Sequence, residues 1–347
     1  MPNRTANRVA VLAIALGLLS PALAQSDPQT EDWSRQDQKY MDRMKPPTEE
    51  DEKKARSPED IRESYIKEAK ELIRDKNYAV KETEHYLIRT DDPRVDPAAA
   101  GILLEQFRTF FVGYWADEVE LRPYDRTSPV FLFYSYYKFN KIVTGKARFD
   151  AFQPAGHYKG DLDLITLHTD SSTLDEVPVT LVHEAAHQLM EKMHYGNRSA
   201  WVSEGMANYF ALTDADGKGT FKPGRIGGPR SSIAKEGDSA RSAAARTHLS
   251  LLRKALKKKE DGLQILEIVD IGSRREFYGP EIRLHYAASW ALVHYLLHGE
   301  DGRYRAGFIR FMESDGPDST GSRALLLAIG AEAEPFQAGF TRYVGKM

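Results

Sequence analysis

Two histidines and a glutamate have the spacing of a metal site in the segment His183-Glu-Ala-Ala-His187. Residues four apart lie on the same face of an α-helix, so His183 and His187 can bind one ion through their imidazoles. Glu184 lies beside these ligands and can take a proton from a metal-activated water without occupying a coordination position. The pattern therefore predicts a metal centre with a general base, which is the chemistry of amide hydrolysis.

The residues around this segment predict one mostly buried helix. Pro178 favours its start, Gly196 favours its end, and most residues between the polar ones are apolar. Burying two histidines and a glutamate without partners is costly, and a bound metal ion removes that cost. A chance match on a surface helix, expected in roughly one protein per hundred of this length, explains the apolar surroundings less well.

A zinc site of this kind needs a third protein ligand, and Glu204 is the best candidate. It follows His187 by seventeen residues and has apolar neighbours. Ser199 can cap the helix that carries Glu204. The small residues Gly205 and Ala207 let this second helix approach the histidine helix closely.

Two other polar residues lie near the predicted ligands. The longer zinc pattern with a third histidine requires Gly and His at the positions of Met190 and Met193, so His194 does not fit it. We interpret His194 as the C-terminal residue of the helix, favoured there by the helix dipole. Asn208, one turn after Glu204, either accepts a hydrogen bond from a metal-bound histidine or faces solvent.

The composition limits the other functional classes. The chain of 347 residues has no cysteine, so a metal site must be built from His, Asp and Glu, and cysteine nucleophiles and disulfide scaffolds are excluded. The 48 basic and 51 acidic side chains leave no basic excess for binding duplex nucleic acid.

The N-terminus predicts export. Residues 1–24 have two arginines, an apolar run from Val9 to Leu19 and the triplet Ala22-Leu-Ala, which is typical of a signal peptide cleaved before Gln25. A membrane anchor is the alternative, but this apolar run is too short to span a bilayer. No later apolar stretch approaches the roughly twenty residues that a span requires. We expect a periplasmic or secreted protein. Residues 25–58 are rich in charge and proline, and we interpret them as a disordered polar tether.

Residues 59–347 predict one domain, with an α/β part over 59–175 and a mainly helical part over 176–347. The sequence patterns predict the following elements: helices over 61–73 and 97–115, strands over 84–90, 129–137 and 161–168, and a long surface loop over 214–242. The aromatic stretch 131–139 favours sheet packing, with a ligand platform as the alternative. The basic run 253–259 predicts a solvated helix face, with attraction to an anionic envelope polymer as the alternative.

Three blocks resemble a known family. The HExxH helix, the block from Trp201 to Phe210 and the helix from Leu284 to Leu297 are similar to those of gluzincin zinc metallopeptidases. The resemblance is to the aminopeptidase N-like branch and its exported bacterial relatives, described as peptidase MA-like. It implies an α+β fold with an N-terminal mixed sheet and a helical C-terminal half. The implied site is this set: Zn²⁺ held by His183, His187 and Glu204, Glu184 as general base, and Tyr286, with His285 as the alternative, stabilising the oxyanion.

The strand over 161–168, preceded by Gly156-His-Tyr158, occupies the place of the family's substrate-binding edge strand. The aminopeptidase branch has a Gly-x-Met-Glu-Asn motif there, which this sequence lacks. The missing motif therefore favours endopeptidase activity or other amide hydrolysis over exopeptidase activity. We expect zinc-dependent cleavage of peptide or protein substrates. The alternatives are a catalytically silent zinc-containing binding or scaffold protein of the cell envelope and an amidase acting on cell-wall peptides.

Overall fold

The computed structural model describes residues 78–144, 154–160, 162–170, 174–194, 199–216, 219–228, 244–257, 262–314 and 320–347. All of these residues belong to the unit Glu59–Met347. The predicted signal peptide, tether and first helix (61–73) lie outside the described residues. Within the described ranges, no helix combines the length and the apolar character needed to cross a lipid bilayer.

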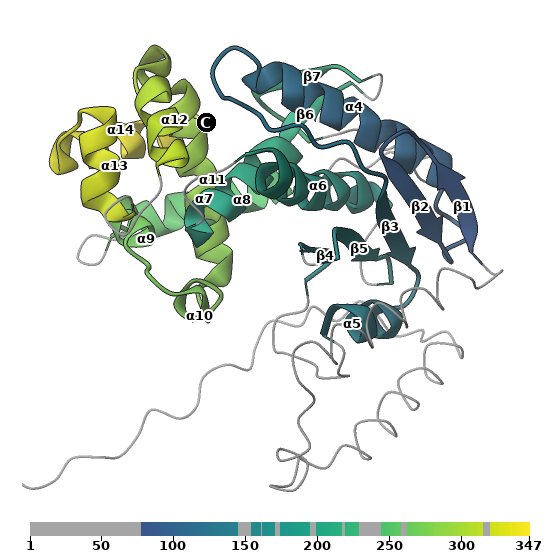
Figure 1. The fold of residues 1–347 in the computed structure, drawn as a ribbon. Helices are drawn as coiled ribbons and strands as arrows, with labels where there is room; N and C mark the ends of the chain where they lie inside the picture. Colours follow the sequence, from purple (N-terminus) through teal and green to yellow (C-terminus); the bar gives the residue numbers. More distant parts are fainter. Residues whose placement is uncertain are drawn as a thin grey trace, which may run out of the picture. The chain divides into compact units, whose positions relative to one another are not determined.

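Five strands form a mixed sheet in the N-terminal half (Figure 1). They are β1 (Ala79–Glu82), β2 (Tyr86–Thr90), β3 (Ser128–Phe133), β4 (Gly156–Lys159) and β5 (Leu164–His168). The order across the sheet is β1-β2-β3-β5-β4. The central strands β2, β3 and β5 run parallel to one another, and both edge strands run antiparallel to their neighbours.

Helices cover both faces of this sheet (Figure 1). They are α4 (Pro97–Trp115), α5 (Tyr136–Thr144) and α6 (Val177–Met193). Alternate residues of β3 face opposite layers: Val130 and Leu132 belong to the core that contains α4 and α6, whereas Phe131 and Phe133 pack in a smaller cluster with residues of α5. Strand β3 is therefore buried on both of its faces, which explains its continuous apolar run.

The predicted strand over 129–137 extends too far at its C-terminal end. Strand β3 stops at Phe133, and α5 begins at Tyr136. The Ser135 hydroxyl accepts a hydrogen bond from the Tyr137 N–H at 3.2 Å, and its carbonyl accepts one from the Phe139 N–H at 3.2 Å. Ser135 thus starts a helix in residues whose β-propensity favours a strand.

The strand predicted over 161–168 is present as β5, but it is not an edge strand. β5 pairs with β3 on one side and with β4 on the other, so all five of its residues are buried. The edge is the four-residue strand β4, which begins at Gly156. The expectations of a half-buried strand and of an edge position at 161–168 are therefore both wrong.

The predicted loop over 214–242 is partly a β-hairpin. Strands β6 (Thr213–Ala215) and β7 (Phe221–Ile226) pair antiparallel, while residues 229–243 lie outside the described residues. The Phe221 ring stacks on that of Phe110 with centroids 4.8 Å apart. This contact anchors the hairpin on α4 despite its polar sequence.

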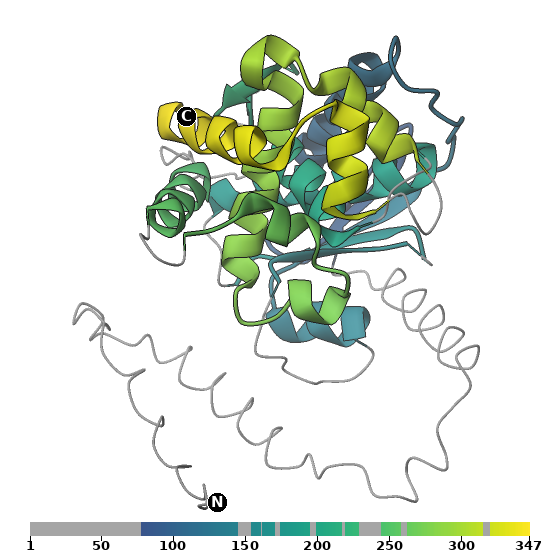
Figure 2. The same cartoon turned by 90° about the vertical axis from the view of Figure 1, so that its left-hand side faces the viewer.

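The C-terminal half is helical. Its helices are α7 (Ala200–Ala211), α8 (Ala244–Leu256), α9 (Ile265–Val269), α10 (Arg274–Phe277), α11 (Ile282–His298), α12 (Arg305–Glu313), α13 (Gly321–Ile329) and α14 (Ala333–Lys346). Figure 2 looks onto this half, with the later helices in green to yellow in front of the sheet. The structure confirms the predicted α+β class with an N-terminal mixed sheet and a helical C-terminal half.

Helix α7 lies between α6 and α11, and almost all of its residues are buried. Gly205 allows the close approach of α7 to α11, because a Cβ atom there would lie 2.7 Å from the Ser289 carbonyl oxygen and 2.8 Å from Val293 Cγ2. The sequence predicts that this small residue lets α7 approach the histidine helix, α6. The structure places it against α11 instead.

Substituting Gly205→Ala should destabilise the domain by about 1–3 kcal/mol, because the new methyl group meets backbone atoms of α11 that cannot rotate away. Gly113→Ala is the matched control, since that helical glycine has no neighbour within 4 Å of a built Cβ. It should leave stability unchanged or raise it by up to about 1 kcal/mol. Urea unfolding of both variants tests this, and equal stabilities would contradict the assigned packing.

Candidate metal centre

Three side chains from α6 and α7 converge on one point. The Nε2 atoms of His183 and His187 lie 3.1 Å apart. Oε2 of Glu204 lies 3.3 Å from the first of these atoms and 3.4 Å from the second. The structure thus confirms that the two helices bring the predicted ligands together as a group able to hold a metal ion.

The separations fit a tetrahedral ion. Ligand atoms at 2.0–2.1 Å from a tetrahedral centre lie about 3.4 Å from one another. The three observed separations, from 3.1 to 3.4 Å, are close to that value without rearrangement. Two imidazoles and a carboxylate form a donor set that suits zinc, and three protein ligands leave a fourth position for water or substrate.

The two oxygens of Glu204 have different surroundings. Oε1 accepts a 2.6 Å hydrogen bond from the Tyr278 hydroxyl, at the end of α10. Oε2 is buried and is the oxygen that faces both imidazoles. Burial alone would raise the pKa of Glu204, but the adjacent His187 and His183 hold that pKa well below its usual range. Glu204 therefore offers one charged oxygen to a cation while Tyr278 fixes the other.

Ser203 contacts the far side of one imidazole. Its hydroxyl lies 3.1 Å from Nδ1 of His187, which leaves Nε2 of the same ring directed at the convergence point. Such a contact orients a metal-binding histidine and fixes its tautomer. The sequence allows two roles for Asn208: a hydrogen bond with a metal-bound histidine, or exposure to solvent. Asn208 is buried, and its Nδ2 has no hydrogen-bond partner among the described residues.

The carboxyl group of Glu184 is packed against the edge strand β4. It accepts a hydrogen bond from the Tyr158 backbone N–H. A Cβ atom at Gly156 would lie 2.8 Å from Oε1 of Glu184, so only glycine fits there. Burial, opposed by His183 and reinforced by the Glu204 carboxylate, raises the pKa of Glu184 to about 7. A carboxyl group with this pKa can accept and release a proton near neutral pH.

Tyr286 lies near the start of α11, beside the predicted ligands. Its ring centroid is 6.5 Å from that of His183, and its hydroxyl interacts with the Glu204 carboxylate. Burial, followed by the charge of Glu204, raises the pKa of Tyr286, so the phenol stays protonated as a donor. The alternative residue His285 instead contacts the Phe277 carbonyl oxygen through Nδ1 at 2.7 Å. This geometry favours Tyr286 over His285 as the hydrogen-bond donor at the site.

Sequence reasoning missed three contacts around the centre: Tyr278 on Glu204, Ser203 on His187, and Gly156 on Glu184. Ser203 directly precedes Glu204, so the helical pattern offered a local signal for it. Tyr278 follows Glu204 by 74 residues, and its contact depends on how α10 packs against α7. His194, which does not fit the longer zinc pattern, is the C-cap residue directly after α6 and is buried.

Removing the Tyr278 hydroxyl should weaken metal binding. In Tyr278→Phe, Oε1 of Glu204 loses its donor, and the carboxylate is no longer held with Oε2 toward the imidazoles. We expect zinc affinity to fall by about 10–100-fold, the usual effect of removing a hydrogen bond to a metal ligand. Titration against a competing chelator measures this, with exposed Tyr134→Phe as the matched control. An affinity within twofold of wild type would contradict the assigned contact.

The buried Glu184 should make the metal-free protein less stable as pH rises. Its folded pKa lies above its unfolded value, so its stabilising contribution is complete below about pH 4.5 and is lost as pH rises through about 7. A shift of this size corresponds to about 3 kcal/mol. In chelator-treated protein, Glu184→Gln should therefore match wild type near pH 4.5 and exceed it in unfolding free energy at pH 8. Exposed Glu191→Gln, on the same helix, is the control, and a pH-independent difference for Glu184→Gln would contradict its burial as a carboxylate.

Comparison with known protein families gives a match over the part of the chain that carries this centre. Residues 178–315 match a family described as "Protein of unknown function (DUF1570)". The matched stretch covers fewer than half of the residues and runs from the start of α6 to just beyond α12. It contains all three residues of the candidate metal centre but no strand of the five-stranded sheet. None of the curated proteins compared with the chain matches it.

Proposed function

We propose that this protein is a zinc-dependent hydrolase of peptide bonds. The observation that carries the proposal is the position of Glu184. This buried carboxyl group directly follows His183 on α6, and it is close enough to His183 and Glu204 for their charges to shift its pKa. A site that only stabilises structure has no use for a neighbouring carboxyl group with a raised pKa, since that group destabilises the fold near neutral pH.

Each residue of the site has its own role in the proposed reaction. His183, His187 and Glu204 would hold the ion, which when bound supplies Lewis acidity that makes water a nucleophile near neutral pH. Glu184 accepts the proton of the attacking water and transfers it to the leaving amine. The Tyr286 hydroxyl donates a hydrogen bond to the oxyanion that forms from the substrate carbonyl.

The edge strand β4 supports an extended peptide as substrate. β4 pairs with β5 on one side only, within the part of the chain that the structure describes. Its Tyr158 N–H reaches Glu184, so β4 passes directly beside the proposed general base. A peptide added along this edge would place its backbone next to the metal centre. The proposal includes the location of the enzyme: the N-terminal sequence favours a periplasmic or secreted protein.

Glu184→Gln should retain zinc and lose hydrolysis by at least about a hundredfold, because the amide cannot accept the proton of water. The measurement is cleavage of a diverse peptide library by the zinc-loaded chain, read by mass spectrometry, with metal content determined in parallel. In the wild type, kcat/KM should fall toward acid pH, where Glu184 becomes protonated and can no longer accept the proton of water. Full activity in Glu184→Gln would remove the general-base assignment.

Tyr286→Phe should lower kcat by about 10²–10³-fold, the usual cost of one oxyanion donor, with little change in metal content. His285→Ala is the neighbouring control and should keep most activity. If His285→Ala abolishes turnover while Tyr286→Phe does not, the donor is His285.

A further inference from the structure

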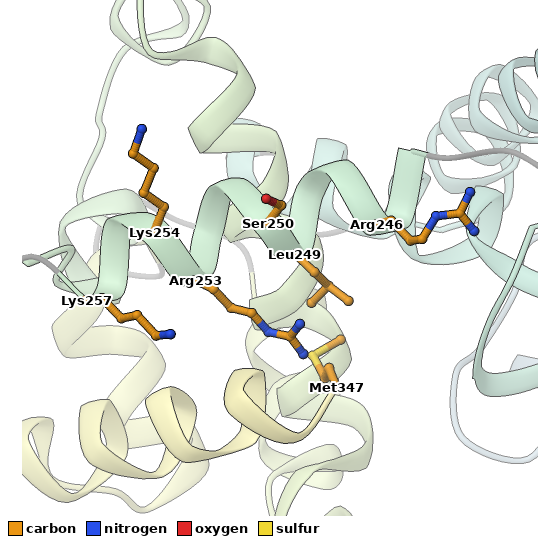
Figure 3. Close-up of a pocket in the computed structure, with 7 residues that line it drawn as sticks. All are labelled: Arg246, Leu249, Ser250, Arg253, Lys254, Lys257 and Met347. Carbon is orange, nitrogen blue, oxygen red and sulfur yellow. The ribbon is translucent and has the colours of Figure 1, made fainter.

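A basic groove lies on α8, separate from the metal ligands. The groove is a hollow of about 760 Å³ lined by Arg246, Leu249, Ser250, Arg253, Lys254, Lys257 and Met347 (Figure 3). Four of these seven residues are cationic and none is acidic. The volume falls within the range of ligand-binding sites.

Within the part of the chain that the structure describes, the cations of this groove have no acidic side chain as a partner. In the described ranges, neither the exposed residues Arg246, Lys254 and Lys257 nor the half-buried Arg253 pairs with an acidic side chain. α8 itself contains no Asp or Glu, although the chain has 51 acidic side chains against 48 basic ones. The positive charge is therefore a local feature of α8 and does not reflect an overall basic composition.

The groove is held in place by packing. The side of α8 that carries Leu252 is buried, and α8 packs against both α11 and α14. Arg253 donates a hydrogen bond from Nε to the Val344 carbonyl oxygen at 3.2 Å, which orients its guanidinium group in the groove. The His248 ring lies 5.8 Å from that of Trp290, one helical turn after Tyr286. α8 thus packs directly against α11, the helix that begins beside the candidate metal centre.

The spacing of the cations along α8 and the kinds of residues that line the groove indicate which class of ligand fits. Arg246 and Lys257 lie near opposite ends of α8, with Arg253 between them (Figure 3). Eleven residues of helix span about 16 Å, which corresponds to about five residues of an extended peptide. The lining contains no aromatic residue on which nucleic-acid bases could stack. Its apolar residues are only Leu249, which is 8% exposed, and Met347, so no large apolar side chain protrudes for insertion into a membrane.

We propose that the α8 groove binds an extended acidic polypeptide and recruits it as a substrate to the neighbouring metal centre. Carboxylates along such a chain pair with the cations on α8, and its apolar side chains contact Leu249 and Met347. The role as a substrate site rests on the proposed peptide hydrolysis, whereas binding itself does not need turnover.

The test is fluorescence anisotropy with a labelled (Glu-Ala)₆ peptide on the full chain carrying Glu184→Gln. The groove variant is the triple charge reversal Arg246→Glu, Lys254→Glu and Lys257→Glu, all at exposed positions. The matched control is the triple reversal Lys81→Glu, Arg126→Glu and Arg303→Glu, also at exposed positions. We expect the groove variant to bind at least about tenfold more weakly in 50 mM salt and the control to stay within threefold. The difference should shrink in 0.5 M salt, because salt screens exposed charges.

Three results would overturn the proposal: equal binding by the groove variant, equal binding of the neutral (Gln-Ala)₆ peptide, or groove-dependent binding of phosphatidylglycerol vesicles without peptide binding. The last result would assign the groove to a membrane surface.

Measurements of activity distinguish failure of the groove proposal from failure of the proposed function. With Glu184 restored, the groove variant should cleave a short neutral peptide normally and an acidic substrate with a raised KM. Groove-dependent peptide binding by a chain that hydrolyses no peptide would contradict the proposed function and leave the groove as a binding site.

Discussion

The convergence of two imidazoles and one carboxylate between α6 and α7 is the constraint on which the rest of the domain depends. Polar groups at this depth are costly unless each has a partner. His183 and His187 come from one helix and Glu204 from the next, so the site exists only while α6 and α7 keep their relative position. The sheet supports α6 from one side, and α11 supports α7 from the other.

The surrounding contacts use polar hydrogen bonds where a purely structural core would use apolar packing. Tyr278 fixes one oxygen of Glu204, Ser203 contacts His187, and the edge strand holds Glu184 through a backbone N–H. Each contact limits the freedom of a side chain whose direction matters for binding a cation or moving a proton. A buried Glu184 lowers the stability of the fold near neutral pH, and this is the kind of conflict between stability and chemistry that functional sites show.

Local sequence patterns predicted the parts of the site that lie on one helix or directly follow it. The spacing of His183 and His187 places them on a common helix face. The apolar neighbours of Glu204 in the sequence identified it as the third candidate ligand. The helix Pro97–Trp115 was also predictable, because Asp96 caps it and proline opens it. Tyr278 and Gly156 could not be found in this way, because their roles arise only from the packing of α10 against α7 and of β4 against α6. The strand β4 itself is four residues long and has too little pattern to mark it as the sheet edge.

X-ray absorption at the zinc edge of the full chain, loaded with one equivalent of zinc, tests the central claim most directly. The account predicts two imidazole nitrogens at about 2.0–2.1 Å, with the remaining scattering from oxygen ligands. It also predicts loss of one oxygen ligand and of tight binding in Glu204→Ala. A spectrum with fewer than two imidazoles, or one unchanged by Glu204→Ala, would show that zinc binds elsewhere and would contradict the assigned centre.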